Sequence, residues 1–164
     1  MNQPVSLLSI AKILFLRTVL AAFLALGGCI TAPDKILFAI SGPGWTVQQG
    51  QAIWRPGLRY PELAGEIVLA QNPDGRSSLQ FTKTLLPVAL AQTTKTHWLI
   101  QFPPQRLGFR GRGQPPQRFV WLHLAAALTG ETPPENFHFT RSPDGGWRLE
   151  NRRTGEFVAG FLSP

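Results

Sequence analysis

The sequence predicts a mainly β domain of the α+β class, in which a curved antiparallel sheet or incomplete β-barrel wraps around one main apolar helix. Three observations predict this fold. Short runs that alternate apolar and polar residues, a pattern typical of half-buried strands, recur along the chain. Turn sequences rich in Gly, Pro, Asn and Asp separate these runs. Only one segment has a convincing helical period, and more than half of its surface is apolar.

The expected strands follow one another as hairpins. Asn72-Pro73-Asp74-Gly75 is a turn in which Pro presets φ and Gly accepts a positive φ, so the runs on either side of it should pair. Gly50 should interrupt the first strand, and Pro103 should end another because proline has no N–H for the ladder. The expected strands are Trp45–Gln49 with Ala52–Trp54, Leu63–Ala70, Ser77–Thr84, Pro87–Gln92, His97–Phe102, Asn136–Arg141, Trp147–Asn151 and Glu156–Leu162.

The expected helix covers Arg118–Thr129. Gly130 is a favourable residue just beyond a helix C-terminus, and Pro133-Pro134 prevents the helix from continuing. We expect so apolar a helix to be buried against the sheet. Its apolar positions are Phe119, Val120, Leu122, Leu124, Ala126, Ala127 and Leu128.

Residues 1–28 have the features of a signal peptide. They contain no acid, Lys12 and Arg17 supply positive charge, and the apolar stretch 18–26 is too short to cross a membrane. Leu26-Gly27-Gly28-Cys29 resembles the lipobox of bacterial lipoproteins. The resemblance implies that Cys29 carries a diacylglyceryl group through a thioether and that cleavage occurs just before it. An uncleaved anchor would place both cations in the bilayer at about 2.5–3.5 kcal/mol each, and ordinary secretion is the other alternative.

This interpretation divides the chain into a cleaved signal peptide (1–28), a lipidated N-terminus and tether (29–44) and one β-rich domain (45–164). Residue 30 is Ile, not the Asp that retains lipoproteins in the inner membrane, so the expected location is the outer membrane, facing the periplasm. The single cysteine excludes an intrachain disulfide. The oligomeric state is left open.

The chain is basic, with 16 Lys+Arg against 9 Asp+Glu. This balance suits an anionic membrane surface or acidic ligands. The basic, Gly- and Pro-rich segment Pro103–Gln117 is expected to be a loop, either simply solvated or in contact with anionic headgroups. An exported chain rarely meets nucleic acid, which argues against an Arg-Gly nucleic-acid segment. The membrane-contact candidates are Arg106, Leu107, Phe109, Arg110 and Arg112.

The chain has five Trp and eleven Phe but one Tyr. Such residues either fill an aromatic core or line an apolar cavity that holds an acyl chain. The sequence does not distinguish these two alternatives. The candidate cavity residues are Phe81, Trp98, Ile100, Phe102, Trp121, Leu124 and Leu128.

No catalytic or metal-binding set is recognisable. His97, His123 and His138 lack the spacing of metal ligands, and the chain has no G-x-S-x-G motif or phosphate-binding loop. We therefore expect no enzymatic activity, no cofactor and no metal.

Leu122–Gly130 followed by Glu131-Thr132-Pro133-Pro134 resembles a stretch of the bacterial lipoprotein carrier and insertase superfamily, the LolA/LolB-like proteins. Leu63–Leu69 and Ser77–Thr84 are similar to its opening hairpins, and the resemblance covers roughly Trp45–Leu162. It implies an incomplete antiparallel barrel with helices over a hydrophobic cavity. The membrane-anchored branch receives lipoproteins and delivers them to the outer membrane.

The chain departs from this family in three respects. The expected mature chain is short for the insertase. It has one clear helix where the family has several. The apolar loop that the insertase uses at the membrane has no matching motif here, although Leu85-Leu86, or Leu107 with Phe109, would suit that role.

The leading expectation is a lipid-anchored binder of acyl chains or lipidated proteins. The alternatives are a structural or assembly lipoprotein that binds another envelope protein, and an envelope hydrolase. A filled core with an exposed apolar patch would favour the assembly protein, and a cleft with a perturbed carboxylate or His would favour the hydrolase.

Overall fold

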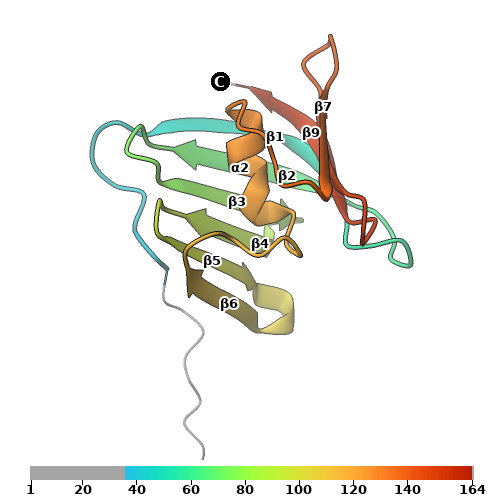
Figure 1. Ribbon diagram of the computed structural model, residues 1–164, viewed down its shortest axis with the longest axis horizontal. Coiled ribbons are helices and arrows are strands. Elements are labelled where there is room, and N and C mark those ends of the chain that lie inside the picture. Colours follow the sequence, from blue (N-terminus) through green and yellow to red (C-terminus); the bar gives the residue numbers. More distant parts are fainter. Residues whose placement is uncertain (1–35, 164) are drawn as a thin grey trace, which may run out of the picture. The chain divides into compact units, whose positions relative to one another are not determined.

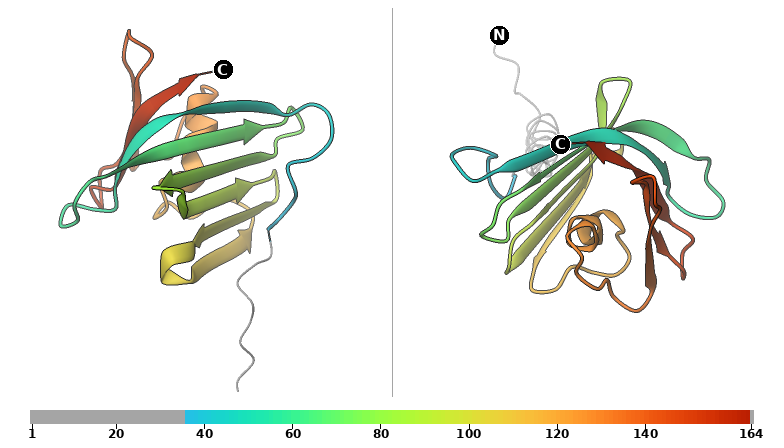
Figure 2. Two further views of the ribbon diagram at one scale, coloured as in Figure 1. Left: turned by 180° about the vertical axis from the view of Figure 1, so that it is seen from behind. Right: turned by 90° about the horizontal axis from the view of Figure 1, so that it is seen from above.

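The structure is a computed structural model that describes residues 36–163. These residues form a nine-stranded antiparallel sheet that curves around one α-helix, α2 (Trp121–Leu128), as Figures 1 and 2 show. The predicted fold class is confirmed. The strands are β1 (Thr46–Arg55), β2 (Leu63–Gln71), β3 (Ser77–Lys83), β4 (Leu86–Thr93), β5 (His97–Phe102), β6 (Leu107–Arg112), β7 (Phe137–Arg141), β8 (Trp147–Asn151) and β9 (Phe157–Ser163).

The strand order explains where the helix lies. The sheet runs β6-β5-β4-β3-β2-β1-β9-β8-β7, so β6 and β7 are its two ends and the sheet is not closed. These two strands are consecutive in the sequence, and the chain must cross from one end of the sheet to the other between them. Helix α2 lies on that crossing and packs between the two arms of the sheet (Figure 2).

The predicted break at Gly50 is wrong, because β1 continues through it. A Cβ at Gly50 would lie 1.8 Å from the carbonyl oxygen of Phe161 on the neighbouring strand β9. Gly160 is similar, since a Cβ there would lie 2.2 Å from the carbonyl oxygen of Gln51. Glycine therefore keeps β1 and β9 paired where the sheet bends, which is a recognised use of glycine inside strands.

Helix α2 is shorter than predicted and begins at Trp121, not at Arg118. Residues 116–119 form a tight turn instead, in which the Phe119 N–H donates to the Pro116 carbonyl. Six of the eight helical residues are buried, as expected for so apolar a helix. The side chains of Ile67, Leu79 and Leu149 are among those that complete the core from the sheet.

Part of the predicted tether is fastened to the sheet. The buried amide of Gln92 accepts a hydrogen bond from Leu37 N–H at 2.7 Å and donates to the Phe38 carbonyl at 3.0 Å. The Arg76 guanidinium lies 5.7 Å from the ring centre of Phe38 and 5.1 Å from that of Trp45. Residues 36–44 have no regular secondary structure, but these contacts hold them beside β3 and β4.

Candidate ligand-binding site

The seven predicted cavity residues lie together between α2 and the sheet. Phe81, Ile100, Trp121 and Leu124 are fully buried. The remaining three, Trp98, Phe102 and Leu128, are partly buried against the same core. All seven belong to one hydrophobic cluster or pack against it, so this region has the form of a filled aromatic core.

Sequence reasoning missed Trp54, which joins the aromatic residues to one another. Its ring centre lies 5.4 Å from that of Trp121, 6.3 Å from Phe81 and 5.9 Å from Phe102. The Trp121 and Phe81 ring centres are 5.2 Å apart. Aromatic pairs at these distances stabilise a core beyond the area that they bury, by about 0.5–1.5 kcal/mol each.

A buried carboxyl group links this cluster to the start of the helix. Glu156 is 6% exposed, and its Oε1 accepts a hydrogen bond from Trp54 Nε1–H at 3.1 Å. Its Oε2 accepts from the Val120 N–H, at the N-terminus of α2, at 3.5 Å. Burial raises the pKa of Glu156 to about 7, and the two hydrogen bonds oppose that shift. Glu156 is not among the residues that line the two pockets described below.

Three buried indole N–H groups have no hydrogen-bond acceptor among the described residues: those of Trp98, Trp121 and Trp147. An unsatisfied buried donor costs about 1–3 kcal/mol. Each of these groups is chemically able to donate to the carbonyl oxygen of an ester or amide. Trp98 lies over Gly111 of β6, where a Cβ would come within 2.5 Å of the indole ring.

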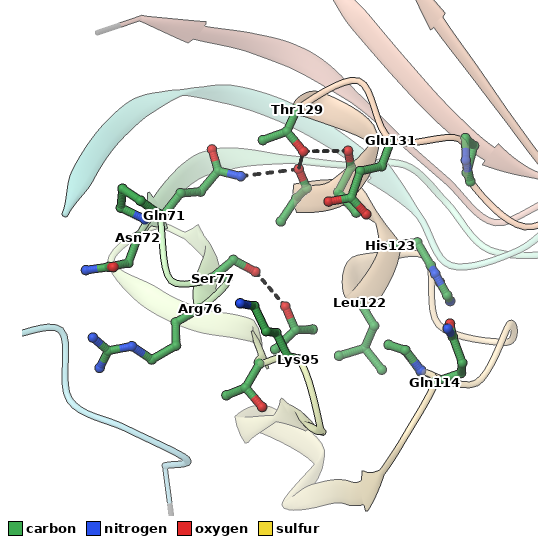
Figure 3. A pocket seen from close by; sticks show the side chains of 18 of the residues that line it. Gln71, Asn72, Arg76, Ser77, Lys95, Gln114, Leu122, His123, Thr129 and Glu131 are labelled. Carbon is green, nitrogen blue, oxygen red and sulfur yellow. Dashed lines mark hydrogen bonds between the residues drawn. The ribbon is translucent and has the colours of Figure 1, made fainter. Parts of the chain in front are cut away.

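A pocket of about 1060 Å³, here called the mouth pocket, opens at one end of the sheet beside α2 (Figure 3). The β2–β3 and β4–β5 turns form its sheet wall, with Arg76, Ser77 and Lys95. Residues of α2 from Leu122 to Ala126 and the segment after the helix form the helix wall, with Thr129 and Glu131. The side chains labelled in Figure 3 include the amides of Gln71, Asn72 and Gln114 and the hydroxyls of Ser77 and Thr129.

A second pocket of about 760 Å³, here called the outer groove, is mainly apolar. Small residues such as Ala64, Ala159 and Gly160 line it, together with Phe161, which is 53% exposed. The groove reaches Leu85 at the β3–β4 hairpin, and that side chain is 91% exposed. The described surface therefore has an exposed apolar patch, the feature expected to favour an assembly protein.

The prediction that Pro103–Gln117 is a loop is wrong for its central part. Pro103–Gln105 is a short 3₁₀ helix, η1, and Leu107–Arg112 is the edge strand β6, paired with β5. The five predicted membrane-contact residues do not share one face. Phe109 packs inward against Phe119 at 5.2 Å, and Leu107 lies on the same side of β6, whereas Arg110 and Arg112 are exposed on the opposite side. Arg106 is exposed at the turn that precedes β6.

The histidines do not form a cluster. His123 packs 4.7 Å from the ring of Phe137 and contacts the Pro116 carbonyl, and burial lowers its pKa. His97 contacts Thr96, and His138 is exposed. Within residues 36–163, no group of three or more His, Cys, Asp or Glu side chains is arranged to hold a metal ion.

The lipobox residues Leu26, Gly27 and Gly28 and the lipid-attachment residue Cys29 lie outside the described residues. Among the residues that are described, no helix has the length and apolar character needed to cross a membrane. A comparison with the sequence models of protein families finds no match, and a search of curated proteins finds no similar sequence.

Proposed function

We propose that this chain is a lipid-anchored protein of the cell envelope whose domain binds the acyl chains of lipids or lipidated proteins. One observation carries the proposal: an almost wholly apolar helix packs inside an antiparallel sheet whose two ends do not pair. In such an arrangement a helix covers an apolar interior without being part of the strand ladder. The resemblance to the lipoprotein carrier and insertase superfamily supports the same proposal.

In the proposed mechanism, an acyl chain takes the place of α2 side chains against the sheet. The helix belongs to the crossing between β6 and β7, so its displacement breaks no strand pair. Transfer of a chain of about 16 carbons out of water contributes roughly 12 kcal/mol, at about 0.8 kcal/mol per CH₂, which offsets the cost of moving the helix. The indole N–H groups of Trp98 and Trp121 supply donors for ester or amide carbonyls.

The β3–β4 hairpin is the proposed membrane contact. Its two-residue turn places Thr84 at φ 49° and Leu85 at φ 67°. Asn-Gly is the usual pair where both φ values are positive, and a β-branched Thr is unfavourable there. Leu85 and Leu86 are 91% and 67% exposed. A strained turn that exposes two leucines supports a functional role for the tip. Leu107 is less exposed, at 51%.

The last part of the proposal is the lipid anchor on Cys29. Lipid on Cys29 holds the domain at the outer membrane, facing the periplasm. Exposed cations such as Arg110 and Arg112 favour contact with anionic lipid, since each basic group near such a surface contributes about 1 kcal/mol.

A direct test is lipid extraction and native mass spectrometry on the segment Ile30–Pro164. This segment lacks Cys29, and it is exported from the cytoplasm without a lipid anchor. We expect co-purified lipid, or a saturable complex after a fatty acid is added. A folded segment that neither carries lipid nor binds fatty acid would exclude this function.

A second candidate function is a structural or assembly lipoprotein that binds another envelope protein. The filled aromatic core together with the exposed apolar patch at Leu85 and Phe161 favours it. One experiment distinguishes the two candidate functions. Acyl-chain binding without a stable protein complex supports the carrier, and a protein complex isolated by cross-linking in whole cells, without acyl-chain binding, supports the assembly role.

A further inference from the structure

The two walls of the mouth pocket carry opposite charges. Lys95 and Arg76 lie on the sheet wall, and Glu131 lies on the helix wall, beyond the C-terminus of α2 (Figure 3). The carbonyl end of a helix adds negative potential to its surroundings. A ligand that carries both an anion and a cation therefore matches the pocket better than a ligand with one charge.

Lys95 is the cation of the sheet wall that no ion pair among the described residues holds, although its charge also helps to lower the pKa of Asp74 on the β2–β3 turn. The Arg76 guanidinium already pairs with Asp74 at 2.6 Å and stacks on Phe38 and Trp45, and in Figure 3 it points away from the pocket. The two ion pairs within residues 36–163 do not involve Lys95. The aliphatic part of the Lys95 side chain lies across the β2–β3 turn, where a Cβ added to Gly75 would be 3.0 Å from Lys95 Cε.

A hydroxyl pair adds a donor to the same wall. Ser77 Oγ and Thr93 Oγ1 are 2.7 Å apart, and only one of the two hydroxyl protons is used between them. The other proton is available to an anion beside Lys95. By contrast, Thr94 Oγ1 already contacts the backbone of Thr96 and His97. An ammonium beside a hydroxyl donor is a suitable environment for a phosphate group.

The helix wall suits a cation. Glu131 is exposed at the rim of the pocket, and it takes part in neither ion pair of residues 36–163. The nearby carbonyls of Ala125 and Ala126 accept hydrogen bonds from Thr129, so the last turn of the helix is fixed where it borders the pocket. A carboxylate in this position would attract an ammonium group.

We propose that the mouth pocket binds a zwitterionic phospholipid headgroup, with its phosphate at Lys95 and the Ser77–Thr93 hydroxyl pair and its ammonium at Glu131. The proposal rests on the proposed function for its choice of a lipid, and it assigns the polar end of that ligand. Because the pocket borders Leu122 and Ala125 of α2, a lipid held there has its acyl chains beside the helix that must move.

The test is calorimetric titration of the full chain, kept in solution by an amphipathic polymer without detergent. The probes are glycerophosphoethanolamine, glycerophosphoglycerol (which lacks the ammonium), inorganic phosphate and the dipeptide Gly-Gly, which is a zwitterion without phosphate. The variants are Lys95→Glu and Glu131→Gln. Their matched controls are Lys83→Glu and Glu135→Gln, since Lys83 and Glu135 are exposed and line no part of this pocket.

We expect saturable binding of glycerophosphoethanolamine at millimolar concentration, about tenfold tighter than that of glycerophosphoglycerol or inorganic phosphate. Lys95→Glu should abolish binding, and Glu131→Gln should remove the preference for the ammonium, whereas the controls should behave as the unmodified chain. Dihexanoyl phosphatidylethanolamine should bind more tightly than its bare headgroup if the ligand is a lipid.

Four results would overturn the proposal: no saturable binding, equal binding of inorganic phosphate and glycerophosphoethanolamine, tighter binding of the dipeptide, or no gain from the acyl chains. The headgroup probe has no acyl chain. Its failure is therefore distinct from a failure of the fatty acid test described above.

Discussion

The carboxylate of Glu156 accepts a hydrogen bond from Trp54 Nε1–H at 3.1 Å, between residues that are 102 positions apart in the sequence. This contact joins β1 to the connection between β8 and β9 at the centre of the aromatic core. The same carboxylate contacts the N–H of Val120, so it also holds the start of α2.

The raised pKa of Glu156 predicts a contribution to stability that is lost as the pH rises. The lowered pKa of His123 contributes in the opposite sense. Between the usual value of 4.5 for Glu156 and its folded value of about 7, the folded state keeps a proton that the unfolded state has lost. The contribution of Glu156 is therefore greatest below this window and falls through it, by about 3 kcal/mol in total. Urea unfolding at pH 5 and pH 8, compared between the unmodified chain and Glu156→Gln, should show this contribution.

Glu156→Gln should remove most of this pH dependence, because the amide oxygen still accepts from Trp54 and has no charge to bury. At pH 8 the variant should be more stable than the unmodified chain. Glu135→Gln, at an exposed position, serves as the control. A variant as pH-dependent as its parent would show that another group titrates.

Gly160→Ala should be strongly destabilising, because the added Cβ would meet the Gln51 carbonyl oxygen at 2.2 Å in the neighbouring strand. We expect a loss of more than about 2 kcal/mol in the free energy of unfolding. Gly108→Ala in β6 is the matched control, since a Cβ there would contact Gln101 Cγ at an ordinary 3.6 Å. Equal effects of the two substitutions would contradict the bend assigned to β1 and β9.

The combined substitution Thr84→Asn with Leu85→Gly should make the domain more stable and less able to bind membranes. The usual residues of this turn replace two that are held at positive φ, which should contribute about 1–2 kcal/mol. Loss of the Leu85 side chain should reduce flotation of the Ile30–Pro164 segment with anionic vesicles. Leu107→Gly tests the other proposed contact, and a larger loss of flotation from that substitution would assign membrane contact to β6.

Cys29→Ala should abolish attachment of the chain to the membrane, since no other residue of the lipobox offers a nucleophilic sulfur. The measurement is metabolic labelling with a radioactive fatty acid, followed by fractionation of the envelope. Label that remains on the variant, or unchanged fractionation with the membrane, would place the anchor elsewhere.

The strands and hairpins could be predicted because alternation and turn chemistry are local. The turn at Asn72–Gly75 forms with the Gly75 N–H donating to the Asn72 carbonyl, as its residues indicate. Strand β6 was not predicted because its six residues include only two apolar side chains, Leu107 and Phe109. The other four are glycine or arginine, and the strand follows shortly after two prolines. An edge strand pairs with a neighbouring strand on one side only, so its sequence indicates a strand less clearly.

The candidate site could be predicted only in part. The apolar residues of the core follow from their alternation, but the sequence does not show that Trp121 and Phe81 fill the space that they line. The mouth pocket depends on turns and a helix end brought together by the strand order, so no local pattern indicates that Lys95 and Glu131 face a common space.

The most direct test of acyl-chain binding is quenching of tryptophan fluorescence by a brominated fatty acid in the Ile30–Pro164 segment. Trp54 of β1 and Trp121 of α2 lie in the core between the sheet and the helix. Bromine must come close to an indole to quench it. Saturable quenching, displaced by an unbrominated fatty acid, is the result that the account predicts. Unchanged fluorescence in a folded segment, with no bound fatty acid by mass spectrometry, would contradict it.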